Sequence, residues 1–311
     1  MELTGGLARG RWLYELQAAT ELVVDYLDPH LCSVPGVEAS HGELPADFIA
    51  TPRLRLSING VLHELICTDP RVLERHYARP RHQEVAYSPR PDRWTDAYHH
   101  ARIRQARRLL VGVTGRVCDV GSGHSLVAMA GPWAFDLCAC DRDAEAINEL
   151  RARGIDGRTG PAEEPPFEPG TFDAVFAGEI VEHLAEPRKA LRRWVELLRP
   201  GGRLIVTTPN RRHLLTRVRG HELVENPEHL FEWNLGELSE AVVGAGGQPQ
   251  SVEGLVLPLP VYVPGRGWRD LGLALVQRGH LPAPVGVRLI ELGRLAPALA
   301  ADLAIVARRV A

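Results

Sequence analysis

Apolar residues follow one pattern up to about residue 95 and a different pattern beyond it. After that point, apolar runs of strand length alternate with stretches of helical spacing. The strand-like runs cover 116–120, 134–141, 172–178, 203–209, 251–257 and 302–309. The helical stretches cover 96–111, 143–153, 182–199 and 236–245. Strands that alternate with helices predict βαβ units, a parallel sheet and right-handed crossovers.

The first 95 residues have patterns that predict both helices and strands. Residues 9–28 have apolar positions at helical spacing, which predicts an amphipathic helix. Residues 53–67 form two apolar runs around Asn59-Gly60, which predicts a β-hairpin that places Arg55 opposite Glu64. A short helix over 70–78 and a proline-containing linker or lid over 79–95 complete this part. We therefore expect an α+β extension before the alternating region.

Composition narrows the function classes. The 311 residues are 45% hydrophobic with a net charge of −3, which excludes a disordered chain and argues against wholesale binding to nucleic acid or a membrane surface. The five cysteines form no C-x-x-C pair, and three of them lie in strand-like runs. The start of the chain has no apolar signal-peptide region, and no apolar stretch reaches about 18 residues. We expect a cytoplasmic protein.

The strongest local signal is a glycine-rich turn after the first strand of the alternating region. There, Gly121-Ser122-Gly123 follows a buried run and precedes a short helix. Glycines at this point allow a tight turn and a close approach of the backbone to a ligand. A dinucleotide-binding fingerprint would need a third small residue where this chain has Leu126, so the turn argues against NAD.

An acidic residue ends the next strand. Asp141 lies 22 residues after Asp119, at the spacing where a carboxylate accepts hydrogen bonds from the two ribose hydroxyls of a nucleoside. Taken alone, an acid at this position is more often just a polar strand terminus. Together with the glycine-rich turn, it favours a nucleoside site at this edge of the sheet.

Several segments resemble one enzyme family in the family's own order. They are VCDVGSG (117–123), CACDRD (138–143), residues 161–184, LRPGGRLIVTTPN (198–210) and PEHLFEWNLGEL (227–238). Residues 96–311 thus resemble a class I S-adenosylmethionine-dependent methyltransferase of the type 11-like small-molecule branch. The resemblance implies a Rossmann-like, doubly wound seven-stranded sheet whose last strand, 302–309, is antiparallel. We expect an insert over 258–300, and residues 1–95 as a lid, substrate or dimerisation element.

The resemblance also implies roles for individual residues. Asp119, Gly121, Ser122 and Gly123 would surround the methionine part of S-adenosylmethionine, and Asp141 would bind its ribose. One departure is Pro161, because the family usually has an aspartate there that meets the adenine amino group. The remaining implied positions are Ala162 and Glu163 beside the adenine, and Gly178 at the floor of the site.

The resemblance implies methyl transfer to a small-molecule acceptor. We expect a hydroxyl acceptor in a biosynthetic pathway, such as a natural-product pathway, with no membrane or nucleic-acid partner and with homodimerisation through the extension. Removing the proton of a hydroxyl needs a base with a pKa near neutral. His183 is our first candidate, because imidazole titrates in that range. Glu179 would orient His183 or take the proton instead.

Three alternatives stay open. Glu179, Glu182, His183 and His229 could bind a divalent ion such as Mg²⁺, although we favour a site without metal. The second alternative is a metal-assisted 3′-terminal RNA ribose 2′-O-methyltransferase. It could use two groups of arginines, which are more often a solvated face: those at 102, 104, 107 and 108 on one helix, and those at 211, 212, 217 and 219. A non-catalytic protein that binds S-adenosylmethionine is the third alternative, supported by Pro161 alone.

Overall fold

The computed structural model describes six strands within residues 3–66, and residues 93–220, 229–265, 267–277 and 283–310. The chain forms two compact units. One comprises residues 1–81 with 224–231, and the other residues 82–223 with 232–311.

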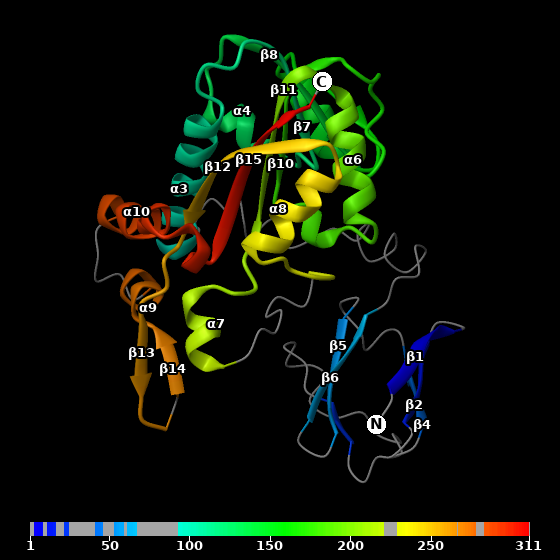
Figure 1. Ribbon diagram of the computed structural model, residues 1–311, viewed down its shortest axis with the longest axis vertical. Coiled ribbons are helices and arrows are strands. Elements are labelled where there is room, and N and C mark those ends of the chain that lie inside the picture. The colour runs from blue at the N-terminus through cyan, green and yellow to red at the C-terminus, as the bar shows by residue number, and fades with distance from the viewer. Residues whose placement is uncertain are drawn as a thin grey trace. The chain divides into compact units, whose positions relative to one another are not determined.

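The first unit contains two small antiparallel sheets (Figure 1). One sheet has the order β1-β2-β4 and consists of β1 (Leu3–Ala8), β2 (Arg11–Leu16) and β4 (His41–Pro45). The other has the order β3-β5-β6 and consists of β3 (Leu22–Val24), β5 (Arg53–Ile58) and β6 (Val61–Ile66). Arg55 pairs with Glu64 and Ile58 with Val61, which confirms the predicted hairpin and its register.

The predicted helix over 9–28 is wrong, because β2 and β3 occupy that stretch. Residues 12, 14 and 16 are Trp, Tyr and Leu, an alternation of apolar positions that also fits a strand. Aromatic and β-branched residues favour strands, and this preference competes with the helical spacing. The predicted helix over 70–78 lies outside the described residues.

The second unit is built on a seven-stranded sheet of the order β12-β15-β11-β10-β7-β8-β9. Only β15 runs antiparallel to its two neighbours, β11 and β12, so the predicted Rossmann-like sheet with an antiparallel last strand is confirmed. The strands are β7 (Gly115–Val120), β8 (Phe135–Asp141), β9 (Asp156–Thr159), β10 (Phe172–Gly178), β11 (Leu198–Pro209), β12 (Gly247–Leu255) and β15 (Asp302–Arg309).

Helices cover both faces of this sheet (Figure 1). On one face, α3 (Arg93–Leu109), α4 (Leu126–Ala130) and α5 (Ala144–Ala152) bury apolar side chains such as Leu109, Val127 and Ile147. On the other face, α6 (Pro187–Leu197) and α8 (Leu235–Gly244) pack against strands of the sheet. Burial of these apolar faces is the main stabilising contribution to the unit.

The segment after β12 is structured, although its sequence predicted only an insert. It forms the hairpin of β13 (Pro260–Val263) and β14 (Gly267–Asp270), followed by α9 (Leu271–Gln277) and α10 (Ala283–Glu291). Helix α10 packs against α3 through Val287 and Ile290. No helix among the described residues is long and apolar enough to cross a membrane.

The order of the strands reverses at β7. From β7 the chain moves through β8 to β9 on one side, and then returns to β10 on the other side of β7. In open α/β sheets, ligands bind beyond the carboxyl ends of the strands where this order reverses. The residues that follow β7 and β10 are therefore the first place to look for a site.

Candidate active site

The glycine-rich turn lies at the carboxyl end of β7. The backbone amides of Gly121 and Ser122 donate to the carbonyl of Cys140, at 2.8 and 3.1 Å. Gly121 has φ +65°, and a Cβ atom there would lie 2.5 Å from Cγ1 of Ile180, so no other residue fits. Gly123 has φ +48° and open space where its side chain would be. The turn thus joins the ends of β7 and β10 and leaves one side accessible.

Asp141 is fixed at the end of β8 by two backbone amides. Its Oδ2 accepts from Gly123 at 2.7 Å, and its Oδ1 accepts from Asp143 at 2.9 Å. A carboxylate offers about four acceptor positions. The two contacts therefore orient Asp141 towards the glycine-rich turn and leave capacity for two further hydrogen bonds, the number that a ribose diol would use.

Asp119 is buried on β7 below the turn. Its Oδ2 accepts from the hydroxyl of Ser125 at 2.7 Å, and the same hydroxyl accepts from the amide of Ala128 at the start of α4. Desolvation raises the pKa of Asp119 to about 7, against the opposing effect of the Ser125 hydrogen bond. Ser122 is also buried, and its hydroxyl donates to the carbonyl of Gly123 at 3.3 Å.

The loop after β9 carries Ala162 and Glu163. Ala162 is buried, and its carbonyl accepts from the indole of Trp194 at 2.7 Å. Glu163 is half-buried and pairs with Arg142, the residue after Asp141, at 3.2 Å. This ion pair connects the loop to the end of β8, so the predicted adenine and ribose positions are neighbours in space.

Gly178 and Glu179 end β10 in a strained turn. Glu179 has φ +55°, an unusual conformation for a residue with a side chain. Its amide donates to the carbonyl of Thr207 at 2.9 Å, and its Oε1 accepts from the Thr207 hydroxyl at 2.7 Å. A Cβ atom at Gly178 would lie 2.7 Å from the ring of Phe176, which explains the glycine. The Glu179 carboxylate is thus held beside β11.

Glu182 and His183 follow in a short 3₁₀ helix, Val181–His183. Glu182 is fully buried, and its Oε2 accepts from the Thr208 hydroxyl at 3.1 Å. Its Oε1 accepts no hydrogen bond from any described residue and lies 3.9 Å from Nε2 of His183. Desolvation and the charge of Glu179 raise the pKa of Glu182 well above its usual range.

The structure brings three of the predicted metal-binding candidates together, since one ligand atom each of Glu182, His183 and His229 lies within 4.8 Å of the other two. Among the arginines of α3, Arg104 and Arg108 form ion pairs with Glu291 at 2.9 and 2.8 Å. Arg107 donates to the carbonyl of Gly131 at 3.0 Å. These three side chains therefore support the interpretation of a structural helix face.

Two residues near the same edge escaped the sequence analysis. Asp302 begins β15 opposite Pro209, and the Tyr98 hydroxyl donates to its Oδ2 at 2.9 Å. Because β15 is antiparallel, its first residue lies where the parallel strands end. That signal was present in the sequence, since an acidic residue opens the strand 302–309.

Comparison with known proteins agrees with this geometry. Residues 118–206 match the model of a family described as a methyltransferase domain. A "probable S-adenosylmethionine-dependent methyltransferase" of Mycolicibacterium smegmatis is 31% identical over 44% of this chain and 52% of that protein. A "ubiquinone biosynthesis O-methyltransferase" of Xanthomonas campestris is 37% identical over 31% of this chain and 44% of that protein. The chain thus spans about half the length of the curated relatives that it matches.

A solved structure supports the fold. The methyltransferase in complex with the Trm112 methyltransferase activator of Haloferax volcanii aligns with 73% of this chain and 96% of its own, at a TM-score of 0.50 and 17% identity. This part of the chain thus has the fold of that solved methyltransferase and is similar in sequence to S-adenosylmethionine-dependent methyltransferases.

Proposed function

We propose that this protein transfers a methyl group from S-adenosylmethionine to a hydroxyl group of a small molecule in a biosynthetic pathway in the cytoplasm. The observation that carries the proposal is the position of Asp141, oriented by Gly123 within a matched methyltransferase domain. Support for a hydroxyl acceptor comes from relatives named as O-methyltransferases. The amino-terminal unit would act as a lid, substrate or dimerisation element.

The residues present fit the methyl donor. Asp141 keeps acceptor capacity for the ribose diol, and the open space beside Gly123 is a cradle that a side chain would fill. Asp119 and Ser122 would contact the methionine part. Pro161 offers no side-chain acceptor for the adenine amino group, so Glu163, held by Arg142, would supply one instead.

The protein's own contribution to such a reaction is placement and proton transfer. When bound, the donor supplies a methyl group on a positively charged sulfur. Methyl transfer by in-line displacement needs alignment of the acceptor, exclusion of water and, for a hydroxyl, a base. His183 would take the proton, because it follows the strand end that floors the crevice. Glu179, fixed by Thr207, would orient the acceptor or share the proton.

A divalent metal is the competing way to activate a hydroxyl, because a bound cation lowers the pKa of its ligand. Glu179 and Glu182 could offer carboxylate oxygens, and His183 and His229 imidazole nitrogens. The Thr207 and Thr208 hydroxyls already donate to the two carboxyl groups, which satisfies them in part without an ion. We therefore retain the metal-free version.

The experiment is methyl transfer from methyl-labelled S-adenosylmethionine to a set of phenols, catechols and hydroxy acids, with amines and short RNAs as comparison acceptors. We expect label in a hydroxyl acceptor, and a turnover that falls about 10²–10⁴-fold in His183→Ala but is unaffected by EDTA. Label only in amines or only in RNA would contradict the hydroxyl assignment. Loss of activity in EDTA that Mg²⁺ restores would instead establish the metal version.

A further inference from the structure

Exposed apolar side chains are concentrated on the hairpin of β13 and β14. Tyr262 on β13 pairs with Trp268 on β14, and the two residues are 59% and 37% exposed. Their rings meet edge to face, with centroids 5.5 Å apart. Val261 on β13 and Leu271 at the start of α9 are also exposed, at 39% and 43%. Large apolar side chains that are exposed together on one small element indicate a surface that binds a partner.

Asp270 closes the base of this hairpin. Its Oδ1 accepts from the backbone amides of Leu259, at 3.2 Å, and Gly272, at 2.8 Å. The amide of Leu271 donates to the carbonyl of Leu259 at 2.9 Å and joins the two ends of the hairpin. The carboxylate of Asp270 is thus held at the base by two backbone donors.

Helix α7 (Leu214–Arg219) supports the hairpin from the side (Figure 1). It packs against both β13 and β14, and the guanidinium of Arg219 donates to the carbonyl of Trp268 at 3.3 Å. A two-stranded ribbon alone is marginally stable in water, so these contacts help to keep the aromatic pair in place. Because α7 follows β11 and the hairpin follows β12, which runs parallel to β11, both lie at the carboxyl edge of the seven-stranded sheet.

The charge of this segment is opposite to that of the whole chain. The chain has a net charge of −3, but residues 256–289 contain Asp270 as their one acid and four arginines, at 266, 269, 278 and 288. Arg269 is exposed on β14, opposite Val261. Arg217 and Arg219 in the last turn of α7 add positive charge beside the hairpin. A partner that covers this surface therefore needs both apolar and negatively charged parts.

A bilayer that contains anionic phospholipids has both. Tyrosine and tryptophan favour the boundary between lipid and water, where the ring is in an apolar environment and its polar atom reaches the headgroups. Arginine can bury its aliphatic stem there and keep its guanidinium beside the phosphates.

A single-stranded nucleic acid fits this surface less well. Its phosphates would also pair with arginine, and its bases stack on aromatic rings. It would leave the exposed aliphatic side chains of Val261 and Leu271 without an apolar partner. The mixture of aliphatic, aromatic and cationic side chains therefore favours a lipid surface.

We propose that the β13–β14 hairpin, together with α7, binds the protein to the surface of a bilayer that contains anionic phospholipids. Tyr262 and Trp268 would enter the boundary between headgroups and acyl chains, and Arg269 would contact phosphates. The net charge of the whole chain, which argues against a membrane surface, does not describe this local segment. The binding itself does not depend on the proposed function. Its consequence, access to an acceptor dissolved in lipid, rests on that function.

The test is co-sedimentation of the whole protein, without any methyl donor, with two kinds of vesicle. One kind is phosphatidylcholine alone, and the other is phosphatidylcholine mixed with phosphatidylglycerol. We expect binding to the mixed vesicles that weakens as the salt concentration rises, because ions screen the attraction between arginines and phosphates. Vesicles of phosphatidylcholine alone should bind much less protein.

Variants locate the binding surface. Arg269→Gln removes one exposed charge, so the affinity for mixed vesicles should fall about 5-fold. Arg192→Gln, at an exposed position on α6, is the matched control and should bind as the wild type does. Replacing both Tyr262 and Trp268 by serine should weaken binding about 10-fold or more, because the apolar area that enters the lipid is lost. Val243→Ser, at an exposed apolar position on α8, is the control for that loss.

Absence of binding to the mixed vesicles at low salt, equal binding to both kinds of vesicle, or equal losses in variants and controls would overturn the inference. Binding to short RNA without binding to vesicles would overturn it too, and so would a dimer that the serine double variant abolishes in a protein that does not bind vesicles. If the double variant does not fold, an unchanged affinity in Arg269→Gln would still contradict the inference. None of these results bears on methyl transfer, so the proposed function would stand or fall separately.

Discussion

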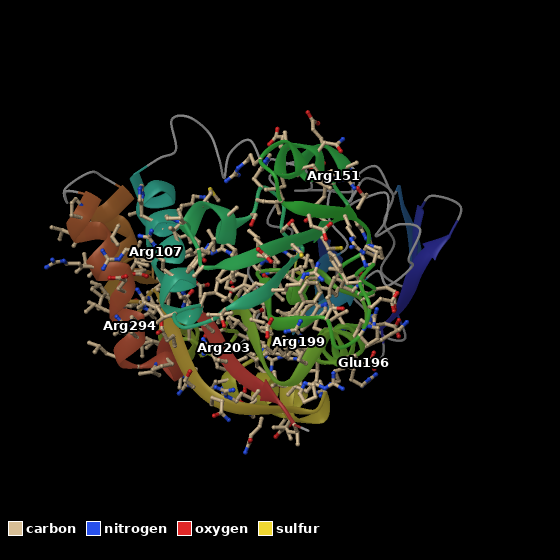
Figure 2. All side chains as sticks on the ribbon, turned by 90° about the horizontal axis from the view of Figure 1, so that it is seen from above. Arg107, Arg151, Glu196, Arg199, Arg203 and Arg294 are labelled. Carbon is tan, nitrogen blue, oxygen red and sulfur yellow. The ribbon has the colours of Figure 1, made fainter. Side chains whose placement is uncertain are left out.

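Charged residues at the amino and carboxyl edges of the seven-stranded sheet have different surroundings. At the amino edge, which Figure 2 views from above, Asp173 on β10 pairs with Arg199 at 3.1 Å and accepts the amide of Arg116 at 2.8 Å. Arg203 at the same edge donates to the carbonyl of Leu109, at the end of α3. At the carboxyl edge, Glu182 and Asp302 face other acids instead, and their pKa values are raised.

The backbone shows the same contrast. Three described residues other than glycine have positive φ, namely Ser125, Glu179 and Val256. Each follows a strand at the carboxyl edge, after β7, β10 and β12 respectively. Such conformations cost roughly 1–2 kcal/mol per residue. The amino edge therefore carries stabilising ion pairs. The carboxyl edge retains backbone strain and unfavourable charge that a bound ligand can relieve.

Among the variants that test this difference between the edges, replacement of Gly121 should change the free energy of unfolding most. Gly121→Ala adds a methyl group in a left-handed conformation and 2.5 Å from Ile180, so we expect the free energy of unfolding to fall by about 2–5 kcal/mol. Gly201→Ala is the matched control, near the start of β11, because Gly201 has φ +75° but nothing within 4 Å of the added atom. Urea titrations that show equal losses for the two variants would refute a close approach at the crevice.

The buried carboxyl of Asp119 should make the free energy of unfolding depend on pH. Because folding raises its pKa to about 7, this group stabilises the wild type most at low pH, and that contribution disappears as the pH rises towards 7. Asp119→Asn keeps an acceptor for Ser125 and has no such dependence. Relative to wild type, the free energy of unfolding of Asp119→Asn should rise by about 3 kcal/mol between pH 5 and 8.

The amino edge supplies the control for this measurement. Asp173→Asn removes an acid that is paired with Arg199, and exposed or half-exposed ion pairs contribute about 0–1 kcal/mol. Its stability relative to wild type should change by less than about 1 kcal/mol over the same range. A change of similar size in both variants would remove the distinction between the two edges.

Much of the sheet could be predicted from local pattern. The bounds of β10 and β15 agree with the predicted runs 172–178 and 302–309, because both are short, buried apolar segments with clear ends. The glycine-rich turn and Asp141 were also recognisable, since the turn requires glycine and its spacing to the acid is short. Cys118, Cys138 and Cys140 are free and buried, as expected of small apolar strand residues.

Other features depend on contacts that no local pattern encodes. Tyr98 and Asp302 are 204 positions apart, and their hydrogen bond exists only because α3 and β15 meet in the folded unit. In the stretch 9–28, helical spacing competed with alternating aromatic positions, and pairing between strands prevailed. The proximity of His229 to Glu182 and His183 likewise follows from tertiary contacts rather than from spacing.

Calorimetric titration with S-adenosylhomocysteine tests most directly whether the carboxyl edge is a methyl-donor site. The wild-type protein should bind one molecule, and Asp141→Ala should weaken binding by about 1–3 kcal/mol, because two ribose hydroxyls lose a charged acceptor. Asp136→Ala, at the exposed end of the same strand, should bind as the wild type does. Absence of binding to the wild-type protein, or equal affinity in Asp141→Ala, would contradict this assignment.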